Sequence, residues 1–289
     1  MTEWWNVPTW RGQQLKLQHW NLPDATAPLR WKKPRVVLLS DFFRPGWNGW
    51  TDEDRDRVFA VMTLCPQHLF VLPTFFAENA KNYIINDPRD AINAEAGLLM
   101  HWDDMPSDPV WPLRNLWLGI HVKTQAEADE IVHKILAIPA ALRFVHITPR
   151  ESIRLDNVGG RWVDCHNALT GEWEDDLDDV GSSTLNKWTN KLDWVIVEGG
   201  ADPMHPDWVR SLRDQCAGAG VPFNFAGWGK LLPWGDWVTD EDAQATKQII
   251  IVRHSNSSEI TRYLFMGDQR RSGRLLDGVE HNAFPEGLE

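Results

Sequence analysis

Short apolar runs alternate with amphipathic stretches along most of the chain. Residues 35–40 form an apolar run of strand length, and residues 51–64 open with a Thr-Asp-Glu-Asp cap and acidic first turn before an amphipathic stretch. This pattern predicts a strand followed by a helix, and it recurs as far as about residue 225. The further predicted strands are 69–72, 116–122, 142–147, 194–197 and 222–225, and the further predicted helices are 77–85, 124–136 and 207–217.

The predicted strands are unbroken runs of Val, Ile and Leu instead of alternating apolar and polar residues. Strands of that kind are buried on both faces, which is typical of a parallel sheet covered by helices, so the predicted fold class is α/β. An open doubly wound sheet and a partial or complete barrel both fit this pattern. Because no G-x-G-x-x-G follows a predicted strand, a dinucleotide-binding sheet is disfavoured. The pattern leaves the open sheet and the barrel both possible, and it adds a long insertion and a C-terminal hairpin to either one.

The chain is predicted to form one domain with appendages. Prolines punctuate a first segment that has no clean hydrophobic period, and an acidic stretch interrupts the later alternation. The predicted parts are a tryptophan-rich N-terminal arm at 1–34, a barrel domain at 35–229 with an insertion at 151–192, and a C-terminal appendage at 230–289 that contains a hairpin of 248–253 and 261–265.

The composition is that of a globular protein, with 43% hydrophobic and 24% charged residues. No apolar run reaches the ~18 residues that a membrane span needs, and the N-terminus lacks the basic start and apolar stretch of a secretory signal. We therefore expect a cytoplasmic protein with no membrane partner. The three cysteines, Cys65, Cys165 and Cys216, are too far apart to form a close-spaced ligand set for a metal or cluster.

The balance of charge bears on nucleic-acid binding. Lys and Arg number 29 against 41 Asp and Glu, and the resulting net charge of −12 disfavours a non-specific grip on phosphate backbones. Local basic clusters leave nucleic acid open as an alternative partner. These clusters are Arg30, Lys32, Lys33 and Arg35 near the N-terminus and Arg270, Arg271 and Arg274 near the C-terminus.

Tryptophan is unusually frequent, with 18 Trp beside 2 Tyr. Such rings are typical packing anchors, and they can also stack on a base or another planar ligand. Trp47 and Trp50 lie in a predicted turn, where they could close over a planar ligand or pack against neighbouring loops. Asn224 ends the last predicted strand and could orient a ligand. The predicted ligand-binding residues are Asn224, Trp47, Trp50 and Trp228.

Polar side chains end several of the predicted strands. His121, His146 and Glu198 end the third, fourth and fifth strands, and Asp41 follows the first. In a barrel these strand ends converge on one mouth, where barrel enzymes keep their chemistry. Two imidazoles with one or two carboxylates could hold Zn²⁺, Mn²⁺ or Fe²⁺, so a divalent transition metal is one predicted cofactor. The alternative is that each residue only satisfies hydrogen bonds at a strand boundary.

Eight segments carry a resemblance to a known family. They are 58–62, 64–68, 110–113, 117–119, 192–197, 204–216, 220–223 and 273–278 (VFAVM, LCPQH, VWPL, WLG, LDWVIV, MHPDWVRSLRDQC, GVPF and GRLLDG). Over about residues 28–285, the chain resembles the phage gp thirty-seven/gp sixty-eight family. That family looks like a branch of the radical S-adenosylmethionine enzymes, which are partial barrels that hold a [4Fe–4S] cluster on an N-terminal three-cysteine motif. The resemblance implies a partial parallel (β/α) barrel, TIM-like or radical-SAM-like, with the long insertion and the C-terminal hairpin added to it. It also implies a protein that is encoded by a phage and located in the host cytoplasm.

This chain departs from the family pattern at the residues that carry the family's chemistry. Residues 1–18 contain no cysteine, so no [4Fe–4S] cluster is expected, and the polar strand ends also differ. We expect first a pseudoenzyme or binding subunit that has lost its iron–sulfur site and works with a protein partner or as a homo-oligomer. The alternatives are a metal-dependent enzyme that uses the strand-end His, His and carboxylate ligands, and a nucleic-acid-associated protein of phage DNA metabolism.

Overall fold

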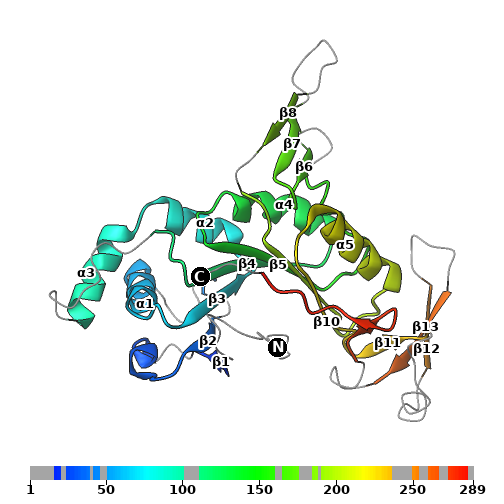
Figure 1. Cartoon of the computed structure of the whole chain (residues 1–289), viewed down its shortest axis with the longest axis horizontal. Helices are drawn as coiled ribbons and strands as arrows, with labels where there is room; N and C mark the ends of the chain where they lie inside the picture. The colour runs from blue at the N-terminus through cyan, green and yellow to red at the C-terminus, as the bar shows by residue number, and fades with distance from the viewer. Residues whose placement is uncertain are drawn as a thin grey trace. The chain divides into compact units, whose positions relative to one another are not determined.

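The architecture comes from a computed structural model of the chain (Figure 1). It describes residues 16–20, 24–39, 42–45, 51–100, 111–159, 165–175, 184–187, 190–235, 249–253, 260–266 and 273–285. Contacts divide the chain into two compact units. The N-terminal unit comprises 5–120, 134–144 and 286–289, and the C-terminal unit comprises 1–4, 121–133 and 145–285.

The main sheet contains seven strands in the order β1-β2-β3-β4-β5-β9-β10. The pairs β1/β2, β2/β3, β3/β4 and β9/β10 are parallel, which confirms the predicted mixed α/β fold with a parallel sheet. Within this sheet the strands lie in the order in which they occur along the chain, which is compatible with a partial barrel. The bounds are β1 (Lys16–His19), β2 (Arg35–Leu38), β3 (Leu69–Thr74), β4 (Leu116–Val122), β5 (Leu142–Ile147), β9 (Trp194–Glu198) and β10 (Phe223–Gly227).

All six predicted strands are present, and β1 is an additional strand inside the segment that was predicted as an arm. Its sequence, Lys-Leu-Gln-His, has only one apolar residue and gives no strand signal by itself. Because β1 pairs only with β2 at the edge of the sheet, backbone pairing forms a strand that local propensity does not.

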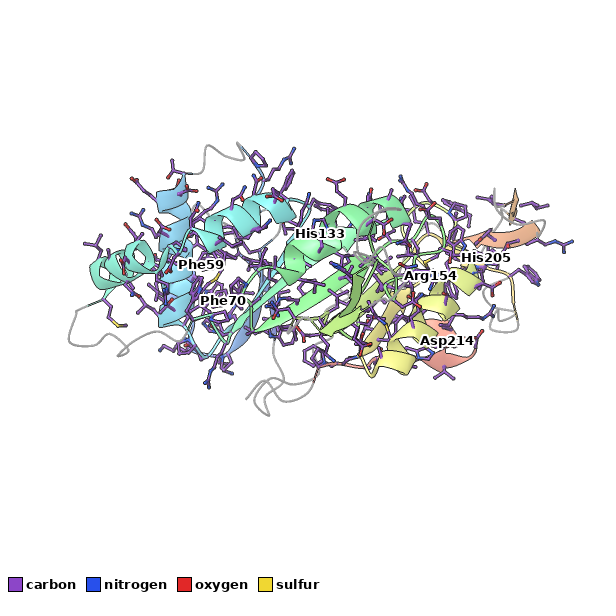
Figure 2. All side chains as sticks on the ribbon, turned by 90° about the horizontal axis from the view of Figure 1, so that it is seen from above. Phe59, Phe70, His133, Arg154, His205 and Asp214 are labelled. Atoms are coloured by element: carbon purple, nitrogen blue, oxygen red, sulfur yellow. The ribbon has the colours of Figure 1, made fainter. Side chains whose placement is uncertain are left out.

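In the N-terminal unit, helices α1 (Asp52–Leu64), α2 (Ala77–Ile85) and α3 (Arg89–Leu99) accompany the first strands, and α1 packs on α3 (Figure 1). The predicted cap of α1 is confirmed: the Thr51 side chain accepts the Asp54 N–H, and the Asp54 carboxylate accepts the Thr51 N–H. Phe59 of α1 and Phe70 of β3 are fully buried in this unit (Figure 2).

In the C-terminal unit, helix α5 (Pro206–Ala219) connects β9 to β10. The His205 ring caps its first turn by accepting the Asp207 N–H, and Gly220 ends it in the left-handed conformation with a φ of 66°. Helix α4 (Gln125–Leu136) begins in the same unit. In the described part of the chain, no helix is both long enough and apolar enough to cross a membrane.

The predicted insertion contains a three-stranded antiparallel sheet: β6 (Cys165–Asn167), β7 (Glu172–Asp175) and β8 (Thr184–Lys187) (Figure 1). Strand β7 begins the acidic stretch 172–179, for which six acidic residues in eight positions predict a solvated loop. The prediction failed there because antiparallel pairing with β6 and β8 outweighs the low strand propensity of acidic residues.

The predicted C-terminal hairpin is confirmed as β12 (Ile249–Arg253) paired antiparallel with β13 (Ile260–Phe265). Strand β11 (Leu231–Pro233) pairs with the other edge of β13. A two-stranded turn, β14 (Leu275–Leu276) with β15 (Val279–Glu280), follows near the C-terminus.

Side chains alternate between the two faces of each strand. On β5, the Arg143 guanidinium donates two hydrogen bonds to the Ile138 carbonyl beyond α4, at 2.9 and 2.7 Å, so this residue lies on the helix-covered face. We call the opposite face, which carries Phe144 and His146, the inner face of the sheet. Gly119 of β4 lies on it against the Phe144 ring.

Gly119 tests how tightly the inner face is packed. A Cβ there would lie 2.2 Å from the Phe144 ring, so Gly119→Ala should lower the free energy of unfolding by about 1–3 kcal/mol through overpacking. The control is Gly218→Ala on α5, where an added Cβ meets nothing within 4 Å; the better helix propensity of alanine should leave stability equal or raise it by up to about 1 kcal/mol. Urea unfolding of both variants checks this, and equal effects would contradict the packing described.

Candidate functional site

Two histidines meet on the inner face in the C-terminal unit. His121 lies near the end of β4 and His146 near the end of β5, and their rings are in edge-to-face contact with centroids 4.9 Å apart. The His121 Nε2 atom is 3.0 Å from Oγ1 of Thr148, the residue just beyond β5. The Thr148 N–H donates to the Val122 carbonyl at 2.9 Å, which fixes the end of β5 beside the end of β4.

Glu198 brings a carboxylate to the same place. It is the last residue of β9, it is only 8% exposed, and its Oε2 lies 3.2 Å from Nε2 of His146, an ion-pairing distance. The structure therefore brings together three of the predicted strand-end residues, His121, His146 and Glu198. Together with Thr148 they form a polar group, here called the strand-end cluster.

Burial determines the charge of His121. Desolvation by burial, with smaller electrostatic effects of His146 and Lys123 in the same direction, lowers the pKa of His121 to about 3. The ring is therefore neutral near pH 7, with one nitrogen that donates and one that accepts a hydrogen bond. The Glu198 carboxylate lies at ion-pairing distance from the His146 ring, where it would stabilise a positive charge on that ring. This arrangement provides a neutral imidazole beside a histidine–carboxylate pair.

Asn224 of β10 extends the polar surface of the inner face by one strand. It is 7% exposed and pairs in register with Ile196, so its side chain lies on the same face as Glu198, two residues further along β9. The Asn224 Oδ1 atom is buried and has no hydrogen-bond partner among the described residues. A buried acceptor without a partner costs about 1–3 kcal/mol, so it is expected where a ligand can satisfy it.

Trp228 occupies a packing position. Its side chain is fully buried, its ring contacts Phe225 edge-to-face at 4.9 Å, and its indole N–H donates to the Leu275 carbonyl at 2.9 Å. The ring therefore has no surface for the ligand contact that we predicted for it. Its backbone also lies against Gly199, where a Cβ would be 2.0 Å from the Trp228 carbonyl oxygen, so only glycine fits there.

The remaining predicted site residues, Asp41, Trp47 and Trp50, lie outside the described residues. Within the described ranges, no three or more His, Cys, Asp and Glu side chains are grouped so that they could hold a metal ion. His121, His146 and Glu198 lie near one another without forming such a group, and the fourth member of the predicted metal set, Asp41, has no described position.

The described thiols are packing groups. Cys65 ends α1 and Cys216 lies on α5; both are buried, and desolvation raises the pKa of each thiol to about 12. A protonated thiol is a poor nucleophile and a poor metal ligand. His68, matched by the family-like segment 64–68, is also structural: its ring is buried, contacts Trp31, and lies 3.2 Å from the Pro28 carbonyl oxygen.

Thr148 is a member of the strand-end cluster that the sequence analysis missed. Its signal was weak, because a threonine after a strand is common. The usable clue was its spacing of two residues from His146, which places both on the same side of an extended chain.

Comparison with known proteins finds a match to the family described as "Protein of unknown function (DUF5131)", over residues 5–285. No curated protein and no solved structure matches the chain.

The neutral His121 predicts a specific sensitivity to acid. Its pKa is 6.5 in the unfolded chain and about 3 in the folded protein, so between these values the unfolded chain binds more protons. The contribution to stability is full above pH 6.5 and is lost as the pH falls towards 3. His121→Gln should therefore lose stability less steeply than the wild type across this window, as measured by urea unfolding at a series of pH values.

The control for this measurement is His133→Gln, which changes an exposed ring on α4 (Figure 2). Its stability should fall with pH as steeply as that of the wild type. A slope for His121→Gln that equals the slopes of the wild type and the control would contradict the buried, neutral state of His121.

Proposed function

The chain belongs to the DUF5131 family, and we propose that it is an enzyme that binds a small molecule at the carboxyl ends of the sheet strands and transfers a proton there. The observation that carries this proposal is the contact of the His146 ring with the Glu198 carboxylate at 3.2 Å, beside the neutral His121. In (β/α) barrels, catalytic side chains come from the carboxyl ends of different strands, as these do.

The proposed roles follow from the chemistry of each group. His146 accepts or donates the proton, because imidazole is the side chain best suited to proton transfer near neutral pH. Glu198 positions the His146 ring and stabilises the positive charge that it gains. His121, held by Thr148, provides a neutral hydrogen-bonding group towards the ligand. The Asn224 Oδ1 atom accepts a hydrogen bond from the ligand.

The finer fold assignment belongs to this proposal. A partial barrel of the TIM-like or radical-SAM-like type is supported by the sequential strand order and by the polar residues at the carboxyl ends of β4, β5 and β9. A relationship to the phage gp thirty-seven/gp sixty-eight family, with its iron–sulfur site lost, is supported by the shared segments and by the absence of cysteine from residues 1–18. In this proposal, proton transfer by the strand-end cluster has replaced the chemistry of the lost iron–sulfur cofactor at the same end of the barrel.

Two expectations from the sequence are less well supported. A pseudoenzyme or binding subunit would have little use for buried, mutually contacting polar side chains on the inner face, because these are costly to bury. A divalent metal at His121, His146 and Glu198 remains a prediction whose fourth ligand, Asp41, lies outside the described residues. Measuring the metal content of protein purified without chelators tests directly whether this metal is bound.

Proton transfer can be tested without knowing the substrate. The protein is incubated in D₂O with mixtures of small organic acids, amino acids, sugars and carbonyl compounds, and ¹H NMR follows the loss of ligand C–H signals. The wild type should exchange at least one compound. His146→Gln should slow that exchange by about 10²–10⁴-fold, the usual contribution of a positioned acid–base group.

The matched control is again His133→Gln, which should exchange the compound at the wild-type rate. Exchange by His146→Gln at the wild-type rate, or no exchange by the wild type in any mixture, would overturn the proposal. Circular dichroism of each variant separates a loss of exchange from a loss of folding.

A further inference from the structure

The Arg274 side chain lies against the carboxyl end of β10. A Cβ built on Gly227, the last residue of β10, would lie 3.7 Å from Cγ of Arg274. Gly227 pairs with Glu198 after an irregularity in the register of β10, so Arg274 lies near the end of β10 that borders β9. Among the sequence-based clusters Arg274 counted only as one of three basic residues near the C-terminus.

Trp228 fixes the segment that carries Arg274. Its backbone N–H donates to the Gly273 carbonyl at 3.4 Å, and its indole N–H donates to the Leu275 carbonyl at 2.9 Å, one residue on each side of Arg274. Gly227 makes this approach feasible, because a Cβ there would be 2.8 Å from the Gly273 carbonyl oxygen. The buried indole thus holds the arginine in place and is a positioning residue.

The C-terminal segment adds a second polar side chain beside β10. The Phe225 N–H donates to the His281 carbonyl, and the Ala283 N–H donates to the Phe223 carbonyl, which makes Asn224 and Asn282 an antiparallel pair with close side chains. The Asn282 side-chain oxygen accepts a hydrogen bond from the Arg274 guanidinium, and its amide group donates to Glu280. Asn282 thereby connects Arg274 to the edge of β10 beside Asn224.

One polar atom of Arg274 and one of Asn224 have no hydrogen-bond partner in the described part of the chain. The Nε atom of Arg274 is buried without a hydrogen-bond partner, and no carboxylate of the described residues forms an ion pair with this guanidinium. The Oδ1 atom of Asn224 is likewise buried without a partner. A guanidinium with one unpaired donor, Nε, and an amide oxygen without a partner therefore both lie near the end of β10.

We propose that Arg274 and Asn224 recognise a small carboxylic acid that carries a hydroxyl or amino group next to its carboxylate. The guanidinium binds the carboxylate through paired N–H donors, which match the planar oxygens of that group. The Asn224 Oδ1 atom accepts the hydrogen bond of the neighbouring hydroxyl or amino group. This assignment rests on the proposed function, since it places the bound acid beside His146 and Glu198, but it depends on Arg274 and Asn224 alone.

The experiment compares two probe molecules that differ by one hydroxyl group. Glycolate carries a carboxylate and a neighbouring hydroxyl, whereas acetate carries the carboxylate alone. Ligand-observed NMR titration measures the Kd of each for the full-length protein. Because satisfying a buried acceptor is worth about 1–3 kcal/mol, glycolate should bind at least about fivefold more tightly than acetate.

Three variants assign that preference to its residues. Arg274→Gln should weaken glycolate binding about tenfold or more, the usual effect of losing a charge-assisted hydrogen bond. Asn224→Leu, of similar volume, should abolish the preference for glycolate over acetate. The control Arg154→Gln changes an exposed arginine that pairs with Asp156, and it should bind both acids as the wild type does (Figure 2).

Equal Kd values for glycolate and acetate in the wild type, or equal glycolate binding by the wild type and Arg274→Gln, would overturn the assignment. Binding of inorganic phosphate without glycolate would also overturn it, because the site would then take a tetrahedral anion. Glycolate binding by His146→Gln separates this assignment from the proposed proton transfer. If this variant binds glycolate and the wild type exchanges no proton, the ligand class is upheld and the proposed acid–base function fails.

Discussion

Hydrogen bonding between parallel, doubly buried strands is the constraint on which the rest of this structure depends. Parallel pairing of β9 with β10 places their carboxyl ends at the same edge, and β4 and β5 end there beside each other through the Thr148–Val122 hydrogen bond. Polar residues cost free energy anywhere along a buried strand, and they cost least at its end. The pairing thus concentrates His121, His146 and Glu198 in one place.

Close backbone packing at the end of β10 depends on glycine. The backbone at Gly229 packs directly against the backbone at Gly199 and Gly200. A Cβ on Gly229 would lie 2.3 Å from the Gly200 carbonyl oxygen. Gly229 also has a φ of 78°, a backbone conformation that residues other than glycine rarely adopt. Gly227, in turn, lets the C-terminal segment approach the end of β10, because a Cβ there would be 2.8 Å from the Gly273 carbonyl oxygen. The same segment supplies the bridge of Asn282 to Asn224 and the candidate ligand-binding group Arg274.

The sequence predicted the parts of the fold that have strong local signals. Six apolar strands and the capped helix α1 were predicted because burial on both faces and a capping box leave clear patterns. Strands β1 and β7 were missed, because pairing with a neighbouring strand formed them from residues of low strand propensity. Helix α3 was also not predicted, although Arg89–Leu99 is amphipathic and packs on α1.

The candidate site was predictable only in part. Histidines and a glutamate at strand ends are visible in a sequence, so three members of the strand-end cluster could be named before their contacts were known. Trp228, a predicted ligand contact, is packed and fully buried, and composition alone does not distinguish a stacking ring from a packed one. The place of Arg274 could not be foreseen, since it depends on tertiary hydrogen bonds between segments about 45 residues apart.

The central claim is that the His146–Glu198 pair is kept for chemistry and not for folding. The most direct test is the free energy of unfolding of a double variant, His146→Phe with Glu198→Leu, measured by urea denaturation beside the wild type. Replacing buried ion-pairing side chains with apolar residues of similar size is often neutral or stabilising by about 1–4 kcal/mol, and the account predicts a variant at least as stable as the wild type. A loss of more than about 2 kcal/mol would show that the pair supports the fold, and it would contradict the account.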